Sequence, residues 1–268
     1  MDLILTTDQM GRQVHVPTQP KRIISLVPSQ TELLFDLGLD VEVVGVTKFC
    51  IHPAGKVKGK AKIGGTKQFH FDKIAALNPD LIIGNKEENE QTQIETLAAE
   101  YPVWMSDIAT LEDALEMIQM VGQLIHKEVE ATDLQNVIQS DFQKSIYTEK
   151  SCAAYFIWKK PYMIAARNTF IDEMMRVAGF ENVYHDMSRY PTTNLEELQE
   201  LQPEIILLSS EPYPFKMKHV AEFQAACSDA KVLIVDGEMF SWYGSRLLKS
   251  VAYFEKLQTS VIMNHEAY

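Results

Sequence analysis

The stretches FDKIAALNPDLII at 71–83 and LEELQELQPEIIL at 195–207 decide the fold, because one local pattern occurs once in each half of the chain. In both, an acidic residue opens a short run of helical spacing, and Pro, an acid and an apolar run follow. Asp72 and Glu196 each precede the proline by seven residues and lie 124 residues apart. A capped helix leading into a buried strand is a common α/β unit. Either carboxylate alone would be explained by the helix dipole, whereas two copies in register indicate a duplicated architecture.

The composition is that of an ordinary globular protein. The 268 residues are 46% hydrophobic, which allows one large domain or two domains of common size. A formal net charge of -12 argues against nucleic acid, which is bound by clustered Lys and Arg. No apolar run approaches the 18 residues of a membrane span.

The cysteines and the N-terminus say little about the compartment. Cys50, Cys152 and Cys227 are odd in number and lack CxxC spacing, which favours reduced thiols. The opening MDLILTTDQMGRQVHVP has no basic region and is not a secretory signal. We therefore expect a periplasmic or cell-surface protein if a signal has been removed upstream, and a cytoplasmic one otherwise.

Strands and helices alternate along both halves. LILTTDQMGRQVHVP predicts an N-terminal hairpin, and RIISLVP at 22–28 predicts a buried parallel strand. Ser29 and Glu32 form a predicted capping box, and Gly38 ends the helix that it opens. The same alternation continues as VEVVGVT, FDKIAALN, PDLIIGN, NEQTQIETLAAEY, PVWMSD and TLEDALEMIQMVGQLI, and then as CAAYFIW, TFIDEMMRVAGF, LEELQELQ, EIILLSS, HVAEFQAACS, KVLIVD and SRLLKSVAYFEKL.

The predicted fold class is α/β, with two lobes that each hold a mainly parallel sheet flanked by helices. One broad apolar stripe predicts a long helix over 128–148, and no Gly, Ser or Pro linker separates the halves. We expect an N-terminal lobe at 1–127, a connecting helix at 128–149 and a C-terminal lobe at 150–268.

A set of motifs resembles the helical-backbone (class III) substrate-binding proteins of ABC importers, the receptors for cobalamin, haem and ferric siderophores. The first half carries RIISLVPSQTELLFDLGLDVEVVGVT, HP, IGG and FDKIAALNPDLII, and the second carries PYMIAARNTFIDEMMRVAGFENVY, YPTTNLEELQELQPEIILLSSEP and FSWYGSRLL. The likeness covers about residues 20–260. It implies two lobes joined by one long helix, with a ligand cleft between them, and a metal chelate as cargo rather than a cofactor.

In the family that the chain resembles, one acidic residue on each lobe pairs with arginines of the permease. Asp72 and Glu196 occupy these positions, although the first lobe more often has Glu. Carboxylates on rigid lobes can accept bidentate Arg and so set the docking register. The resemblance thus implies a permease partner for a protein that we expect to be a monomer.

Ligand groups of α/β lobes gather at the carboxyl ends of parallel strands. The segments predicted there contain the aromatic residues Phe49, Tyr162, Tyr190, Tyr213, Phe215, Phe240, Trp242 and Tyr243 and the cations Lys67, Lys86, Arg167 and Arg246. Such a mixture suits a large, flat, partly anionic chelate. By the resemblance, Phe49, Tyr162 and Tyr190 line the ligand, and Thr66 replaces a tryptophan of the cobalamin receptor.

Three other interpretations remain open. The lysines of GKVKGKAKIGGTK form either a solvated loop or a basic rim for anionic ligands. Cys50, His52 and His70 do not form a compact ligand set, so we expect no bound metal ion. No GxSxG, P-loop or GxGxxG is present, which disfavours an enzyme. A cytosolic chelate carrier or sensor is the main alternative to an importer's binding protein.

Overall fold

The computed structural model describes residues 2–145, 147 and 150–262. The chain forms two compact units. Unit 1 comprises 1–108, 112–138 and 243–246, and unit 2 comprises 109–111, 139–242 and 247–268. The sequence placed all of 150–268 in the second lobe, whereas Tyr243–Arg246 lies with unit 1. No helix among the described residues is long and apolar enough to cross a bilayer.

Unit 1 begins with the expected hairpin and continues as a parallel sheet. Strands β1 (Leu3–Thr7) and β2 (Gln13–Pro17) pair antiparallel. The sheet has the order β5-β4-β3-β6-β7, and all its pairs are parallel. Its strands are β3 (Ile23–Ser25), β4 (Val43–Val46), β5 (Ala61–Lys62), β6 (Leu81–Asn85) and β7 (Val103–Ser106).

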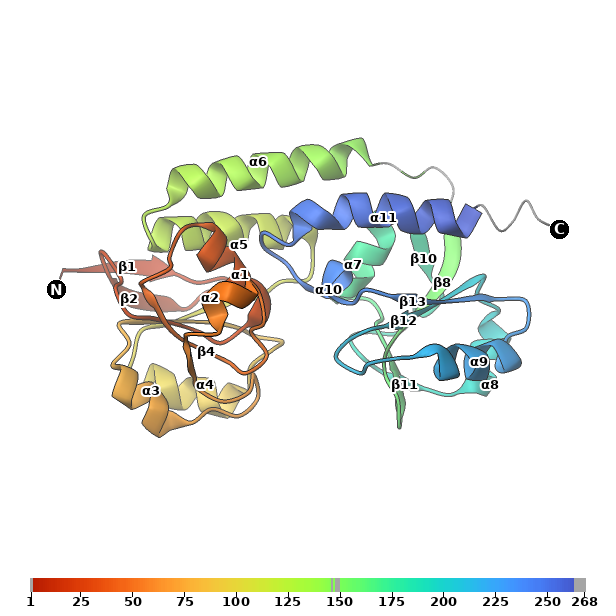
Figure 1. Ribbon diagram of the computed structural model, residues 1–268, viewed down its shortest axis with the longest axis horizontal. Helices are drawn as coiled ribbons and strands as arrows, with labels where there is room; N and C mark the ends of the chain where they lie inside the picture. Colours follow the sequence, from red (N-terminus) through yellow and green to blue (C-terminus); the bar gives the residue numbers. More distant parts are fainter. Residues whose placement is uncertain (1, 146, 148–149, 263–268) are drawn as a thin grey trace. The chain divides into compact units, whose positions relative to one another are not determined.

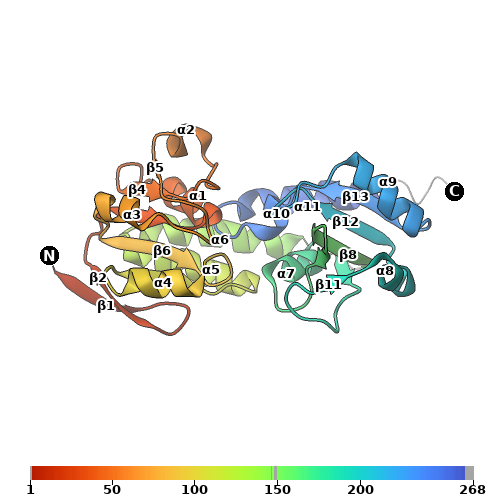
Figure 2. The same cartoon turned by 90° about the horizontal axis from the view of Figure 1, so that it is seen from below.

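Helices cover both faces of this sheet. They are α1 (Pro28–Asp36), α2 (Ala54–Val57), α3 (Phe71–Leu77), α4 (Gln91–Ala98) and α5 (Leu111–Leu124). Figures 1 and 2 show α3 and α4 on one face and α5 on the other. All strands run in the same direction, so the carboxyl ends of β3, β4, β5, β6 and β7 lie at one edge.

The predicted capping box at the start of α1 is wrong. The helix begins at Pro28, Val27 is its N-cap, and no side chain caps it. Proline is favoured in the first turn because its missing N–H would have no partner there. Ser29 and Glu32 are buried inside the helix. Gly38 follows the helix with φ of 90°, as its predicted role at the helix end requires.

Helix α6 (Glu128–Lys144) leads from unit 1 into unit 2. It confirms a helix in the predicted range 128–148, of which residues 146, 148 and 149 lie outside the described part. Its first half packs closely on α5. A Cβ on Gly122 would lie 2.4 Å from Cβ of Ala131, so the two backbones approach where only glycine fits.

Unit 2 has a mixed sheet of order β11-β9-β8-β12-β13, with β10 also paired to β8. The pairs among β8, β10, β12 and β13 are parallel, and β9 and β11 add an antiparallel edge. The strands are β8 (Ser151–Trp158), β9 (Tyr162–Ile164), β10 (Phe180–Asn182), β11 (Thr192–Thr193), β12 (Ile205–Ser209) and β13 (Lys231–Val235). The sequence did not predict β9, β10 and β11, because each is only two or three residues long.

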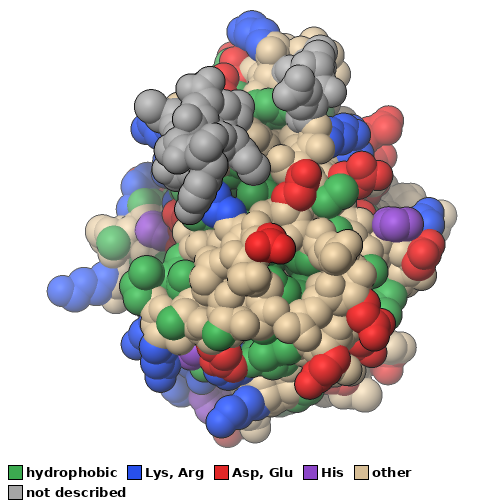
Figure 3. Space-filling model, turned by 90° about the vertical axis from the view of Figure 1, so that its right-hand side faces the viewer, with side chains coloured by type: hydrophobic (Ala, Val, Ile, Leu, Met, Phe, Trp, Pro, Cys, Tyr) green, Lys and Arg blue, Asp and Glu red, His purple; other side chains and the backbone are tan. Residues whose placement is uncertain are grey.

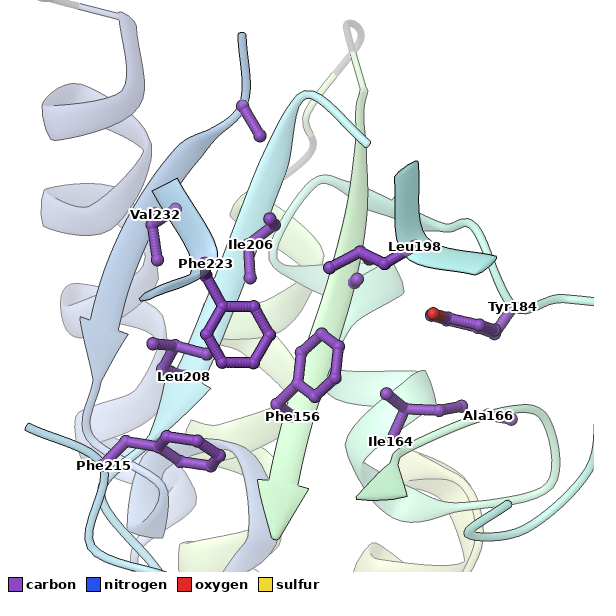
Figure 4. Close-up of a cluster of buried hydrophobic side chains, with 12 residues drawn as sticks. Phe156, Ile164, Ala166, Tyr184, Leu198, Ile206, Leu208, Phe215, Phe223 and Val232 are labelled. Atoms are coloured by element: carbon purple, nitrogen blue, oxygen red, sulfur yellow. The ribbon is translucent and has the colours of Figure 1, made fainter. Parts of the chain in front are cut away.

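Helices again lie on both faces of the unit 2 sheet. They are α7 (Phe170–Val177), α8 (Leu195–Leu201), α9 (Met217–Ala226), α10 (Glu238–Ser241) and α11 (Leu247–Ile262). Figure 1 shows α8 and α9 on the face opposite α7 and α11. The core under α8 and α9 is drawn in Figure 4, where Phe156 of β8 faces Phe223 of α9. Their ring centroids are 4.7 Å apart in an edge-to-face contact.

The two stretches quoted at the outset fold alike. Helices α3 and α8 are each seven residues long, and the residue after each is left-handed, Asn78 with φ of 45° and Gln202 with φ of 47°. Each helix buries one residue at the same position, Ile74 or Leu198, and leads into a fully buried strand. The repeated sequence pattern therefore builds an equivalent helix–strand unit in each lobe.

Candidate functional site

A tight turn at the carboxyl edge of unit 1 presents Thr66 and Lys67. Gly64 has φ of 122°, and a Cβ there would lie 2.4 Å from the carbonyl oxygen of Gln68. The amide of Gly65 donates to that same oxygen at 2.8 Å and closes the turn. A backbone of this shape is accessible to glycine and strained for other residues. The IGG motif is thus explained by the turn that it forms.

Phe49 lies beside this turn. Its side chain is 50% exposed, and Lys48 Nζ lies 4.9 Å from its ring centroid. A Cβ on Gly65 would be 3.3 Å from the Phe49 ring, so ring and turn are in close proximity. The half-buried Thr66 is held through its carbonyl oxygen, which accepts from Asn89 Nδ2 at 3.0 Å. The structure therefore brings the predicted Phe49 and Thr66 together.

Two predicted lysines lie at the same edge. Lys67 Nζ donates to the carbonyl oxygen of Glu87 at 2.6 Å, which ties the turn to the residues after β6. Lys86 Nζ contacts Asp107 Oδ2 at 2.5 Å, just beyond β7. Both lysines are exposed. Phe49, Thr66, Lys67 and Lys86 thus all lie at the carboxyl edge of the unit 1 sheet.

The predicted ligand residue Arg246 is not on that exposed edge. It is 5% exposed, and its Nε donates to Oε2 of the equally buried Glu32 at 2.8 Å. A buried guanidinium needs such a carboxylate partner, because an uncompensated charge in the interior is strongly destabilising. The sequence showed only that a cation follows the last strand, and not that an acid inside α1 receives it.

Tyr162 of unit 2 packs into the core beneath α9. Its ring makes edge-to-face contacts with Phe156 and Phe223, and its hydroxyl donates to Glu222. Glu222 also pairs with Lys159 Nζ. Burial, together with the Glu222 carboxylate, raises the pKa of Tyr162 above its ordinary value. Tyr162 is therefore half-buried and engaged within the unit.

Arg167 and Tyr190 come from neighbouring backbone segments. The carbonyl oxygen of Arg167 accepts from the amide of Arg189 at 2.8 Å, and Arg167 forms a bridge with Ser188. Arg167 is exposed and Tyr190 is half-buried. The segment that holds Arg167 therefore lies beside the segment that leads into Tyr190, on the side of unit 2 that carries β9 and β11.

Trp242, by contrast, is 6% exposed and donates its indole N–H to Glu211 Oε1 at 2.9 Å. Ser241 Oγ donates to the same oxygen at 2.8 Å. Burial raises the pKa of the Glu211 carboxyl, and the negative charges of Glu238 and Asp236 raise it further. The aromatic residues Phe215, Phe240 and Tyr243 are likewise buried. Position at a strand end thus did not make these rings accessible.

Two notable residues were absent from the predicted site. Glu211 lies two residues after β12 and forms the buried acceptor just described. Trp158 ends β8 and is 40% exposed. The signal for Trp158 was available, because CAAYFIW places a large aromatic at the carboxyl end of a predicted parallel strand.

The two predicted docking carboxylates are both exposed. Asp72 and Glu196 each lie in the first turn of their helix, at the same position. On the face of the molecule shown in Figure 3, Asp and Glu side chains are spread over the surface and the Lys and Arg side chains lie mostly toward its rim. That face therefore has no broad basic area of the kind that binds nucleic acid.

Metal-binding side chains are not clustered in the described part of the chain, where no three His, Cys, Asp or Glu are placed to share an ion. Cys50, Cys152 and Cys227 are free thiols. Burial raises the pKa of Cys50, whose sulfur lies 3.1 Å from Thr31 Oγ1 and 3.2 Å from Thr47 Oγ1. Cys50 is accordingly a packed core residue.

Two α/β units, each with aromatic and charged side chains at the carboxyl edge of its sheet, define a two-lobed binding protein. Residues 23–229 match the family described as periplasmic binding protein. Since the match covers most of the chain, the protein belongs to the periplasmic binding protein family.

Individual relatives agree with this membership. The chain is 26% identical over 271 residues to the uncharacterized ABC transporter substrate-binding lipoprotein YvrC of Bacillus subtilis, covering 95% of this chain and 84% of the relative. It is 25% identical over 237 residues to the vitamin B12-binding protein of Pectobacterium carotovorum, covering 85% of each. The apo periplasmic heme-binding protein RhuT from Roseiflexus has the same fold, with a TM-score of 0.77 and 20% identity over 90% of this chain and 97% of that one.

These findings confirm the predicted class. The protein is a substrate-binding protein of the kind that serves ABC importers, and it is not an enzyme. A protein of this class works with a membrane permease and carries its small-molecule ligand as cargo.

Proposed function

We propose that this protein captures a metal chelate, namely a ferric siderophore, cobalamin or haem, and delivers it to the permease of an ABC importer. The observation that carries the proposal is that Phe49, Thr66, Lys67 and Lys86 lie at the same sheet edge of unit 1. An exposed ring with the ammonium group of Lys48 beside it, and further lysines along the same edge, suits a chelate with a flat apolar body and anionic substituents.

The remaining proposed ligand residues lie in unit 2, apart from Arg246, which belongs to unit 1. Arg167 is exposed and Tyr190 is half-buried, so both have surface to offer. Tyr162 acts chiefly by packing, and Trp242 and Arg246 act by shaping the backbone around them, because all three are engaged inside their units. The ligand is cargo, and no resident cofactor is part of the proposal.

Asp72 and Glu196 are the proposed contacts with the permease. They occupy equivalent positions on two rigid helices and are exposed, so each can accept a bidentate arginine without rearrangement of the fold. In this role the protein acts as a monomer outside the cytoplasmic membrane. The relatives support that location, since one is a lipoprotein and others are periplasmic.

The experiment is a titration of the purified protein with hemin, cyanocobalamin and ferrioxamine B, followed by absorbance and calorimetry. We expect one of these chelates to bind with a micromolar or lower dissociation constant. Phe49→Leu should weaken that binding, while Val41→Ala, at an exposed apolar residue before β4, should leave it unchanged. Failure of all three chelates to bind would contradict the proposed function.

A further inference from the structure

Trp158 breaks the usual pattern of burial along β8. Ala154 and Phe156, four and two residues before it, are completely buried in the core under α9, whereas Trp158 is 40% exposed. It is the last residue of the strand and lies at the carboxyl edge of the sheet. Trp158 thus continues the apolar face formed by Ala154 and Phe156 beyond the buried core, and its side chain is the largest of the three.

The exposed indole is held in place. Its ring centroid lies 5.6 Å from that of Tyr213 in an edge-to-face contact. Tyr213 in turn contacts Phe215 at 4.9 Å and His219 at 5.6 Å, and Phe215 belongs to the buried core. An aromatic side chain that is positioned by packing and still exposed loses little entropy when a ligand covers it.

The neighbouring charge is already engaged within the unit. Lys159, the next residue, pairs with Glu222, which also accepts from Tyr162. The described ring contact of Trp158 is with another aromatic residue. The surface that Trp158 offers is therefore an aromatic platform on which the face of a conjugated ring system can stack.

From this geometry we propose that Trp158 is a specificity-determining residue of the ligand site and stacks on a planar, conjugated metal chelate. The inference rests on the proposed function and narrows its cargo. It favours a tetrapyrrole or corrin over an aliphatic hydroxamate. Carboxyl edges of parallel sheets are where α/β proteins gather their ligands, and Trp158 ends a central strand at that edge.

The test compares Trp158→Leu and Trp158→Phe with the unchanged protein, using hemin, cyanocobalamin and ferrioxamine B. Leucine keeps an apolar side chain but removes the flat ring, so we expect about tenfold weaker binding of the conjugated chelate. Phenylalanine keeps a ring and should retain most of the affinity. Leu201→Ala is the matched control, because Leu201 is 41% exposed and ends α8, four residues before β12 begins and thus toward the amino-terminal edge of the same sheet.

A second readout does not depend on affinity. The chain has three tryptophans, and Trp104 and Trp242 are buried. The indole N–H signal of Trp158 in a nitrogen-15 NMR spectrum is identified by its loss in Trp158→Phe. It should shift or broaden when hemin or cyanocobalamin binds.

The outcomes distinguish failure of the Trp158 inference from failure of the proposed function. If a conjugated chelate binds but Trp158→Leu retains full affinity, or the Trp158 signal does not change, Trp158 is not part of the site. If only ferrioxamine B binds, the proposed function stands and the conjugated cargo is wrong. If no chelate binds, both are overturned.

Discussion

Arg246 donates its Nε hydrogen to Glu32 Oε2 at 2.8 Å, although 214 residues separate them. Glu32 lies inside α1, and Arg246 ends the segment Tyr243–Arg246, which belongs to unit 1 while the residues on either side belong to unit 2. Both side chains are almost fully buried. This ion pair therefore anchors the late segment within the first unit.

Removing one partner of that pair should be costly. We expect Glu32→Ala to lower the free energy of unfolding by about 3–5 kcal/mol, because the Arg246 charge would remain buried without its carboxylate. Urea denaturation measures the effect. Asp107→Ala, which breaks the exposed pair with Lys86, is the control and should cost about 0–1 kcal/mol. Equal costs for the two variants would contradict the assigned role of the buried pair.

Gly64→Ala should displace the turn that carries Thr66 and Lys67. The new Cβ would lie 2.4 Å from the Gln68 oxygen, at a residue whose φ of 122° is left-handed. We therefore expect the free energy of unfolding to fall by about 1–3 kcal/mol and chelate binding to weaken. Gly59→Ala is the matched control, since nothing lies within 4 Å of its Cβ position. Thermal unfolding and the chelate titration test both effects. An unchanged affinity in a folded Gly64→Ala protein would remove this turn from the site.

The buried Glu211 should make stability depend on pH. Its raised pKa means that the native state holds a proton at higher pH than the unfolded chain, whose ordinary value is 4.5. Its contribution to stability is therefore greatest below about pH 4.5 and is lost as pH rises through the raised native value. Glu211→Gln keeps an oxygen for Ser241 and Trp242 but does not titrate.

We expect Glu211→Gln to gain stability relative to the unchanged protein as pH rises from 4.5 to 8. Each unit of pKa difference corresponds to about 1.4 kcal/mol. Urea unfolding at both pH values measures the change, and Glu200→Gln on the exposed face of α8 serves as the control. The prediction would be contradicted if the difference in free energy of unfolding between Glu211→Gln and the unchanged protein were the same at both pH values.

Charge reversal at Asp72 or Glu196 should uncouple binding from delivery. We expect Asp72→Lys and Glu196→Lys to abolish stimulation of the partner importer's ATPase while the chelate affinity stays within about twofold, since like charges repel at a docking interface. Glu100→Lys, after α4, and Glu181→Lys, on β10, reverse exposed charges at the opposite sheet edges and serve as controls. Weakened chelate binding in the two docking variants would instead place these carboxylates in the ligand site.

Much of the fold was predictable because its signals are local. The helix–strand units at 71–85 and 195–209 follow from helical spacing, a proline and a buried β-branched run, all within about fifteen residues. The short strands β9, β10 and β11 carry no such pattern. They exist because neighbouring backbone offers hydrogen bonds, which is a property of the folded sheet.

The site was less predictable, because strand-end position does not decide exposure. Phe49 and Trp242 both follow a predicted strand, yet one ring is half exposed and the other is buried against Glu211. Trp158 was overlooked, although CAAYFIW places it at the end of a predicted strand. Which of these rings reaches solvent depends on the helices and loops packed around each strand.

The sequence by itself determined the duplicated α/β architecture and the positions of Asp72 and Glu196, since periodicity and a repeated pattern within short segments encode them. Its motifs indicated the class of protein by their resemblance to a known family. Only the tertiary structure decided that Glu32 pairs with Arg246 instead of capping a helix. It also decided that Trp158 is exposed at the sheet edge. Pairing across 214 residues and burial of a side chain depend on elements that meet only when the whole chain has folded.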